Sequence, residues 1–172
     1  MNFTLRPWRE EDAASLAQAA NDPAVAANLR DAFPCPYSLA DAQWFINDCI
    51  AHNRQDRLVY AVTVGGRPVG CVSVQLQSDV YRKSAELGYW LAQPYWGQGV
   101  MTRAVSQICQ EAFGLFDIVR IYAEPFVHNQ SSRRVLEKAG FSLEGVMRDG
   151  VFKRGRVYSY CMYSLLRREA GL

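Results

Sequence analysis

The sequence predicts one α/β (α+β) domain, spanning residues 1–172, with a mixed, mostly antiparallel sheet of about seven strands flanked by helices. Three observations support this. Short β-rich runs are bounded by glycine or proline, and amphipathic helical stretches separate several of them. The elements follow the order strand, helices, three strands, helix, strand, helix, two strands, which mixes hairpins with helical crossovers. The composition, 49% hydrophobic and 21% charged over 172 residues, is that of an ordinary globular protein.

The first third of the chain predicts an edge strand followed by helices. Asp22 is a helix cap with Pro23 at the first helical position, and Ser38 caps a further helix. A proline-rich linker, Phe33–Tyr37, separates the second helix from the third. The expected ranges are an edge strand Phe3–Arg6, and helices Glu11–Ala20, Ala24–Ala32 and from Ser38 through His52.

The remaining elements surround a strand, a glycine turn and a helix. Two β-rich runs, Leu58–Val64 and Val69–Leu76, form a hairpin across Gly65-Gly66. The strand Glu86–Leu91 follows and ends before Pro94. After Gly99 the apolar residues recur with helical spacing. Later elements are the strand Ile118–Ala123, a helix over 130–139 that Gly140 ends, and closing strands Leu143–Phe152 and Val157–Leu166.

The glycine turn is a candidate phosphate cradle. The first backbone N–H groups of a helix have no partner within it, and they lie at the positive end of the helix dipole. A plain strand-to-helix turn is the alternative. The Gly-Lys-Ser/Thr ending of nucleotide hydrolases and the third glycine of the dinucleotide fingerprint are both absent. The candidate N–H donors belong to Gly97, Gln98, Gly99, Val100, Met101 and Thr102.

Two motifs resemble one known family. The stretch YWGQGVMTRAV resembles the acyl-coenzyme A pyrophosphate loop of the GNAT superfamily of N-acetyltransferases, in the form found in its RimJ/RimL-like branch. Gly99 matches the central glycine, whereas Met101 replaces a small residue. Downstream, HNQSSRRVLEKAGF resembles the Asn-x-x-Ser-x-Arg-Val-Leu-Glu-Lys-x-Gly-Phe motif of the same branch. The resemblance covers nearly the whole chain, more weakly in its first half.

The resemblance implies a GNAT fold whose fourth and fifth strands separate to hold acetyl-CoA. It implies that the backbone of Tyr89–Leu91 pairs with the pantetheine arm, which Asn129 also contacts. Capping the following helix is the alternative role of Asn129. Ser132 is the candidate acid that protonates the departing thiolate. Arg134, together with Arg133, is a candidate contact of the phosphate-bearing end, although exposed helix arginines are common.

The general base is less well specified than the acid. Glu86 is the only acid on the central strand, where a carboxylate can take a proton from the attacking amine. A structural carboxylate that bonds a neighbouring strand or loop is the competing interpretation. Asp149 is the second candidate. The position at which RimL-like enzymes can carry a glutamate is Val151 here, so that role does not transfer.

The implied reaction is direct attack of a primary amine on the thioester of acetyl-CoA. The acceptor is either a small-molecule amine or a protein N-terminus, and both stay open. Trp44, Phe33 and Tyr37 either wall the acceptor pocket, as the resemblance implies, or pack in the core. The alternative function is a non-catalytic acyl-CoA or nucleotide-binding module, which the departures at Met101 and Val151 favour.

Composition limits the partners and the compartment. The net charge of +2 predicts neither a nucleic acid nor a membrane partner. Nothing in the sequence predicts a signal peptide or a membrane span. The 5 cysteines are scattered and only 2 histidines accompany them, so we expect reduced thiols, no metal site and a cytoplasmic protein.

The last two strands raise two further possibilities. The closing strand is rich in apolar and aromatic residues, which predicts that part of it meets a second copy of the chain in a homodimer. Its residues are Val157, Tyr158, Tyr160, Cys161 and Tyr163. A basic cluster around the preceding turn is either a solvated hairpin tip or a site for an acidic group. It comprises Arg148, Lys153, Arg154 and Arg156.

Overall fold

A computed structural model describes residues 1–172. All seven strands belong to one sheet in the order β1-β2-β3-β4-β5-β7-β6, in which only β4 and β5 run parallel. The predicted fold class, a mixed and mostly antiparallel sheet, is confirmed. The strands are β1 Thr4–Arg6, β2 Arg57–Val64, β3 Arg67–Leu76, β4 Ser84–Leu91, β5 Arg120–Ala123, β6 Ser142–Lys153 and β7 Arg156–Leu166.

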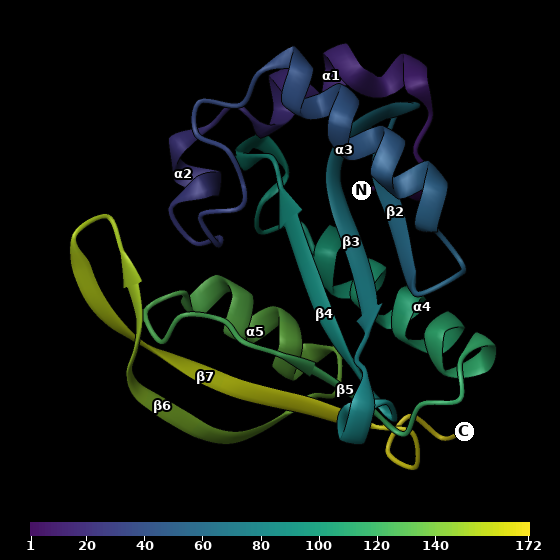
Figure 1. Ribbon diagram of the computed structural model, residues 1–172, viewed down its shortest axis with the longest axis vertical. Helices are drawn as coiled ribbons and strands as arrows, with labels where there is room; N and C mark the ends of the chain where they lie inside the picture. The colour runs from purple at the N-terminus through teal and green to yellow at the C-terminus, as the bar shows by residue number, and fades with distance from the viewer.

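Helices cover both faces of the sheet (Figure 1). On one face α1 and α3 pack over β2 and β3, around a smaller apolar core that includes Trp8 and Ile46. On the other face α4 and α5 enclose the larger core, which includes Ile108 and Leu136. The helices are α1 Ala13–Ala20, α2 Pro23–Ala26, α3 Leu39–His52, α4 Val100–Leu115 and α5 Gln130–Lys138, with short 3-10 turns at Glu10–Asp12, Asp79–Tyr81 and Gln93–Tyr95.

Local signals in the sequence produced the expected boundaries. The Ser38 side chain accepts a hydrogen bond from the backbone N–H of Asp41 at 3.1 Å, and the Asp41 carboxylate accepts one from the Ser38 N–H at 2.8 Å. This reciprocal capping box begins α3. Gly65 and Gly66 both have positive φ, 57° and 82°, as the two-residue hairpin between β2 and β3 requires.

Strands β4 and β5 are paired only at their first residues. The parallel pairing joins Ser84–Glu86 to Arg120–Tyr122, and beyond Glu86 the two strands diverge. In Figure 1, β4 continues toward α2 while β7 and β6 curve away beneath α5. Residues Leu87–Leu91 therefore have a strand neighbour only in β3, and their other edge faces an opening in the sheet. This divergence is the one that the resemblance implied.

One expectation about a helical segment was wrong, and two about the last strands are narrowed. The helix expected over Ala24–Ala32 ends at Ala26, because Asn28 and Leu29 donate to carbonyls three residues back and turn the chain toward the opening. Part of the closing strand was expected at a partner surface, and Tyr163 and Cys161 do not belong to that part, because both are fully buried in their own chain. Lys153 is not a solvated hairpin-tip residue: it is buried and its Nζ donates to Asp31 Oδ1 at 2.9 Å.

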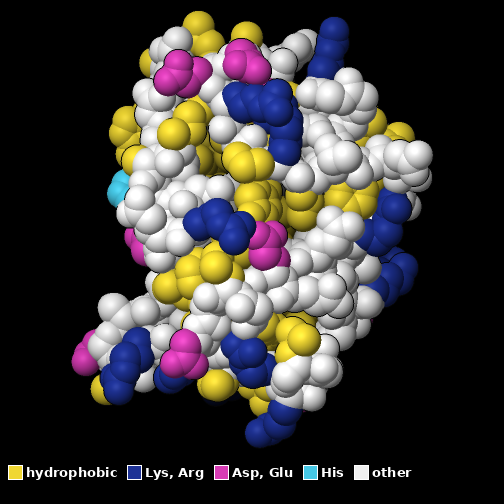
Figure 2. Space-filling view, turned by 90° about the vertical axis from the view of Figure 1, so that its right-hand side faces the viewer, with side chains coloured by type: hydrophobic (Ala, Val, Ile, Leu, Met, Phe, Trp, Pro, Cys, Tyr) yellow, Lys and Arg dark blue, Asp and Glu magenta, His cyan; other side chains and the backbone are white.

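The surface carries no long stripe of one charge on the side shown in Figure 2, where basic and acidic side chains alternate with apolar ones. The helices are also too short or too polar for any of them to cross a lipid bilayer.

Candidate active site

A cleft of about 940 Å³ occupies the opening between the two halves of the sheet. Most candidate site residues from the sequence line it, whereas Gln98, Arg133 and Asp149 do not. The Gln98 side chain donates to the Pro94 carbonyl at 2.9 Å. The cleft therefore joins two motifs that lie far apart in the chain. Its predicted lining residues are Glu86, Tyr89, Trp90, Leu91, Gly97, Gly99, Val100, Met101, Thr102, Asn129, Ser132 and Arg134.

The glycine turn presents free backbone donors to the cleft. Gly97 and Gly99 have φ of 72° and 71°, a left-handed conformation that side chains other than glycine rarely adopt. None of the backbone N–H groups from Gly97 to Thr102 donates to a protein acceptor. A Cβ at either glycine would meet nothing within 4 Å, so the space above the turn is open. Unpaired donors, an open approach and a 16-residue helix behind them fit a pyrophosphate.

Met101 does not obstruct this cradle. Its residue is 6% exposed and belongs to the larger apolar core. Because only its backbone N–H is needed by an anion, the replacement of a small residue by methionine leaves the donor set intact.

The free edge of β4 supplies a second set of backbone groups. Ala92 N–H donates to the Val69 carbonyl at 2.8 Å, which fixes the alternation of the β3–β4 ladder. Trp90 consequently pairs with Cys71 on β3, whereas the backbone of Tyr89 and Leu91 points into the opening. There the Leu91 carbonyl accepts a hydrogen bond from the indole Nε1 of Trp96 at 2.6 Å. Of the predicted stretch Tyr89–Leu91, the backbone at Tyr89 and the Leu91 N–H are available to a ligand.

Asn129 and Ser132 hold the start of α5. The Asn129 side-chain oxygen accepts from the Ser132 backbone N–H at 3.2 Å, so its expected cap is present. Its amide NH₂ group remains available, so capping and ligand binding are compatible. Arg133 donates to the Tyr163 hydroxyl and the Val127 carbonyl, both at 3.2 Å, while Arg134 lines the cleft without a side-chain partner.

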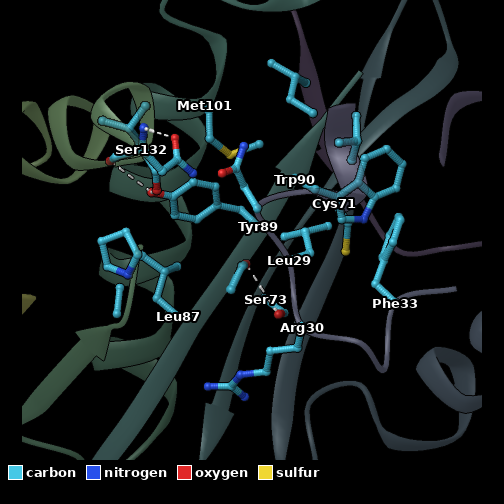
Figure 3. Close-up of a pocket in the computed structure, with 18 of the residues that line it drawn as sticks. Leu29, Arg30, Phe33, Cys71, Ser73, Leu87, Tyr89, Trp90, Met101 and Ser132 are labelled. Carbon is cyan, nitrogen blue, oxygen red and sulfur yellow. Dashed lines mark hydrogen bonds between the residues drawn. The ribbon is translucent and has the colours of Figure 1, made fainter. Parts of the chain in front are cut away.

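The Ser132 hydroxyl has a partner that sequence reasoning missed. Its Oγ lies 2.7 Å from the hydroxyl oxygen of Tyr89, and Figure 3 shows the two side chains next to each other. Burial raises the pKa of Tyr89, so this phenol keeps its proton at neutral pH. Strand alternation could have placed the Tyr89 side chain toward the helices, but nothing local indicated its partner.

The Glu86 carboxylate belongs to a charged cluster. Arg30, from the segment after α2, contacts both Glu86 and Glu124 through one nitrogen, Nη2. Burial first, and then the charge of Glu86, raise the pKa of Glu124 despite Arg30. Asp149, the second candidate base, does not line the cleft. Glu124 directly follows the expected strand Ile118–Ala123, and that position was the available signal for it.

The three aromatic residues expected near the acceptor differ in their surroundings. Tyr37 is buried in the smaller core, so its packing role is observed, although it also borders the cleft. Phe33 packs edge-on against Trp90 with ring centroids 5.7 Å apart. Trp44 is 71% exposed and lines the cleft mouth, so core packing does not explain it.

Comparison with known proteins accounts for this arrangement. Residues 2–142 match the acetyltransferase (GNAT) domain family. The chain belongs to the GNAT acetyltransferase family. The uncharacterized N-acetyltransferase p20 of Bacillus licheniformis is 30% identical over 97% of the chain and 94% of its own length. YdaF of Bacillus subtilis (strain 168), a proposed ribosomal N-acetyltransferase, is 38% identical over 60% of the chain, and the matched part spans only 56% of YdaF.

A solved acetyltransferase structure has the same fold. The microcin C7 self-immunity acetyltransferase MccE, in complex with acetyl-CoA and AMP, superposes with a TM-score of 0.83. The match covers 95% of this chain and 92% of MccE at 25% identity. The family and RimJ/RimL-like branch indicated by the two motifs, and the acetyltransferase class that follows from them, are confirmed.

Proposed function

We propose that this GNAT acetyltransferase transfers an acetyl group from acetyl-CoA to a primary amine by direct attack. The observation that supports it most is the continuity of the free donors at Gly97–Thr102 with the unpaired edge of β4. When bound, acetyl-CoA supplies an acetyl group activated as a thioester. The cradle N–H groups bind its pyrophosphate, and the backbone at Tyr89 orients its amide-bearing arm as an added strand would be oriented.

Ser132 and Tyr89 protonate the thiolate as it departs. Their hydroxyls lie 2.7 Å apart, so a proton given by Ser132 can be replaced from Tyr89. Because its pKa is raised, the Tyr89 hydroxyl stays protonated at neutral pH. The Leu91 N–H, at the free edge of β4, polarises the thioester carbonyl. No step in this scheme is assigned to a metal.

Glu86 takes a proton from the incoming ammonium. Its carboxylate is 22% exposed, which leaves it reachable from the cleft. Its contact with Arg30 is also the structural role that the sequence left open, and the two roles coexist. Neutralising the ammonium frees the nitrogen lone pair for attack. The family relatives include a proposed ribosomal acetyltransferase, and the MccE structure holds AMP, so protein and small-molecule acceptors both remain candidates.

A non-catalytic binding module is the second candidate. Its support was the pair of departures at Met101 and Val151. Met101 no longer supports it, because its side chain leaves the cradle open. Val151 lines the cleft and supplies no acid there.

Two measurements test the proposal. Acetyl-CoA should raise the melting temperature, because it binds the folded state alone, and ATP should do much less. Ser132→Ala and Tyr89→Phe should each lower kcat by roughly 10²-fold while leaving the Kd of acetyl-CoA nearly unchanged. Release of free thiol with a panel of amines reports the activity. Equal protection by ATP contradicts the pantetheine assignment, and binding without thiol release supports the non-catalytic module.

We also propose a cytoplasmic location, which agrees with five unpaired cysteines, four of them buried. The homodimer remains a prediction as well. Burial of Tyr163 and Cys161 reduces its candidate surface to Val157, 55% exposed, and the half-buried Tyr158 and Tyr160. Light scattering at tens of micromolar would test it.

A further inference from the structure

The strongest unassigned feature of the cleft is the contact of one cation with two carboxylates. Arg30 Nη2 contacts Glu86 Oε1 and lies 3.2 Å from Glu124 Oε2. The Glu86 and Glu124 side chains are 22% and 27% exposed, whereas that of Arg30 is 67% exposed. We call Glu86 and Glu124 the carboxylate pair. Glu86 lies on β4 and Glu124 directly follows β5, whereas the cation comes from the segment after α2, outside any helix or strand.

The charges of this cluster do not balance. Two carboxylates and one guanidinium leave a formal charge of one negative unit in a partly dry cleft, where charge interactions are stronger than in water. Arg30 makes no other side-chain hydrogen bond. Its backbone segment is anchored separately, through Phe33 against Trp90 and Asp31 against Lys153. The side chain can therefore leave the carboxylate pair without unfolding the segment.

We propose that the carboxylate pair is the subsite for the acceptor's ammonium group and that Arg30 is a resident cation which the acceptor displaces. This inference rests on the proposed function and makes it more specific. One nitrogen already lies between Glu86 and Glu124, at the place that a primary ammonium nitrogen would take. Figure 3 shows the Arg30 side chain well apart from the Tyr89–Ser132 pair, so the acceptor and the thiolate donors would occupy different parts of the cleft.

The proton and bond changes balance in this arrangement. The ammonium gives one proton to the carboxylate pair, and its nitrogen forms the new C–N bond. The C–S bond breaks, and the sulfur takes a proton from Ser132. The protonated amide nitrogen then gives its excess proton to the Ser132 oxygen, which restores the hydroxyl, and the carboxylate pair releases the proton that it took to solvent. The products are an N-acetyl amide, coenzyme A thiol and one released proton.

The subsite selects acceptors by charge. An amine without a neighbouring carboxylate gains from both glutamates, whereas a free α-amino acid brings its own carboxylate against them. The acceptors are therefore alkylamines, amino-acid amides or peptide N-termini, and free amino acids are excluded. Alanine and alaninamide form a matched pair of probes, because they are alike in size and only alanine carries the carboxylate.

The test separates subsite binding from catalysis. Propylguanidinium resembles the Arg30 head group and lacks a primary amine. Its Kd is measured by calorimetry on the full chain with coenzyme A present. If Arg30 occupies the site nine-tenths of the time, Arg30→Ala should tighten this Kd by about tenfold, because the competent fraction of the protein rises. Arg30→Lys should restore wild-type affinity.

Glu124→Gln should weaken the Kd of propylguanidinium, and in the double variant the gain from Arg30→Ala should disappear. Arg54→Ala is the matched control, since Arg54 pairs with Glu111 away from the cleft and its loss should change nothing. In thiol-release assays, alaninamide should react and alanine should not, and Arg30→Ala should lower the KM for alaninamide.

An unchanged or weaker Kd in Arg30→Ala overturns the resident-cation role, and equal reaction of alanine overturns the subsite. Stabilisation by coenzyme A is measured in the same samples. If coenzyme A stabilises the protein but either of these two results is found, only this inference is wrong. If coenzyme A does not stabilise the protein, the proposed function is wrong, and propylguanidinium binding still reports on the carboxylate pair.

Discussion

Two arginine–carboxylate clusters in this protein use the same residue types and differ in how fully they are satisfied. Near the N-terminus, Arg6 donates to both oxygens of Asp12, at 2.7 and 2.8 Å, and Asp12 also accepts the Arg9 backbone N–H at 3.0 Å. The Arg6 and Asp12 side chains are 18% and 6% exposed. In the cleft, Arg30 reaches the carboxylate pair through a single nitrogen and stays 67% exposed.

The carboxyl pKa values differ in direction. At Asp12 burial acts to raise the pKa, but the hydrogen bond from Arg6 and the one from Arg9 outweigh it, so the pKa is lowered. At Glu124 burial and the charge of Glu86 outweigh Arg30, so the pKa is raised. The bidentate Arg6–Asp12 pair thus favours the ionised form of Asp12 in the folded protein. Where Arg30 is shared between two carboxylates, the ionised form of Glu124 is disfavoured. The first arrangement stabilises the fold, and the second retains capacity for a ligand.

The largest effect that we expect is on stability at the first cluster. Asp12→Asn leaves the Arg6 charge mostly buried without its partner, which should lower the free energy of unfolding by about 3 kcal/mol. Urea denaturation, followed by circular dichroism, measures it. Glu124→Gln is the matched variant in the cleft, and it should cost less than about 1 kcal/mol. Similar losses at both sites would contradict the distinction.

The pH dependence of stability should have opposite signs at the two carboxylates. The contribution of Asp12 is present above its unfolded pKa of about 3.9 and is lost as the pH falls through its lowered folded value. Glu124 has a raised folded pKa, so it reduces stability as the pH rises from about 4.3 through that value. The Asp12→Asn deficit should therefore shrink toward acid pH, whereas Glu124→Gln should gain on the wild type toward neutral pH. Denaturation series at several pH values measure both trends.

The acid limb of the rate profile gives a third difference. Protonation of Glu124, which faces Glu86, Arg30 and Tyr122, should weaken acceptor binding and reduce kcat/KM at low pH. Removing the opposing charge in Arg30→Ala should move this limb to higher pH, because the guanidinium lowers the Glu124 pKa. Asp12→Asn should leave the limb in place. If Arg30→Ala does not move the acid limb, the limb reports the titration of a group other than Glu124.

The contrast also shows what sequence could predict. Ser38, the Gly65-Gly66 turn and Gly99 act through their own neighbours, so their caps, hairpin and cradle were predictable from residue type and spacing. The Arg30–Glu124 contact joins residues 94 apart, and no local pattern encodes it. The segment that carries Arg30 was expected to continue the helix that begins after the Asp22 cap and Pro23. Tertiary contacts of Phe33 and Asp31 override that local signal.

The smallest expected effect concerns Arg30 itself. Because its side chain is mostly exposed and its ion pairs are shared, Arg30→Ala should change the free energy of unfolding by no more than about 0.5 kcal/mol. Without Arg30, the repulsion between Glu86 and Glu124 is no longer relieved. This offsets any stability gained because the Arg30 side chain is no longer held in place. Arg6→Ala, measured in the same urea series, should cost several times more because it leaves Asp12 buried and ionised. If Arg30→Ala proves as costly as Arg6→Ala, the cleft cluster is a structural pair like the first, and its cation is not exchangeable.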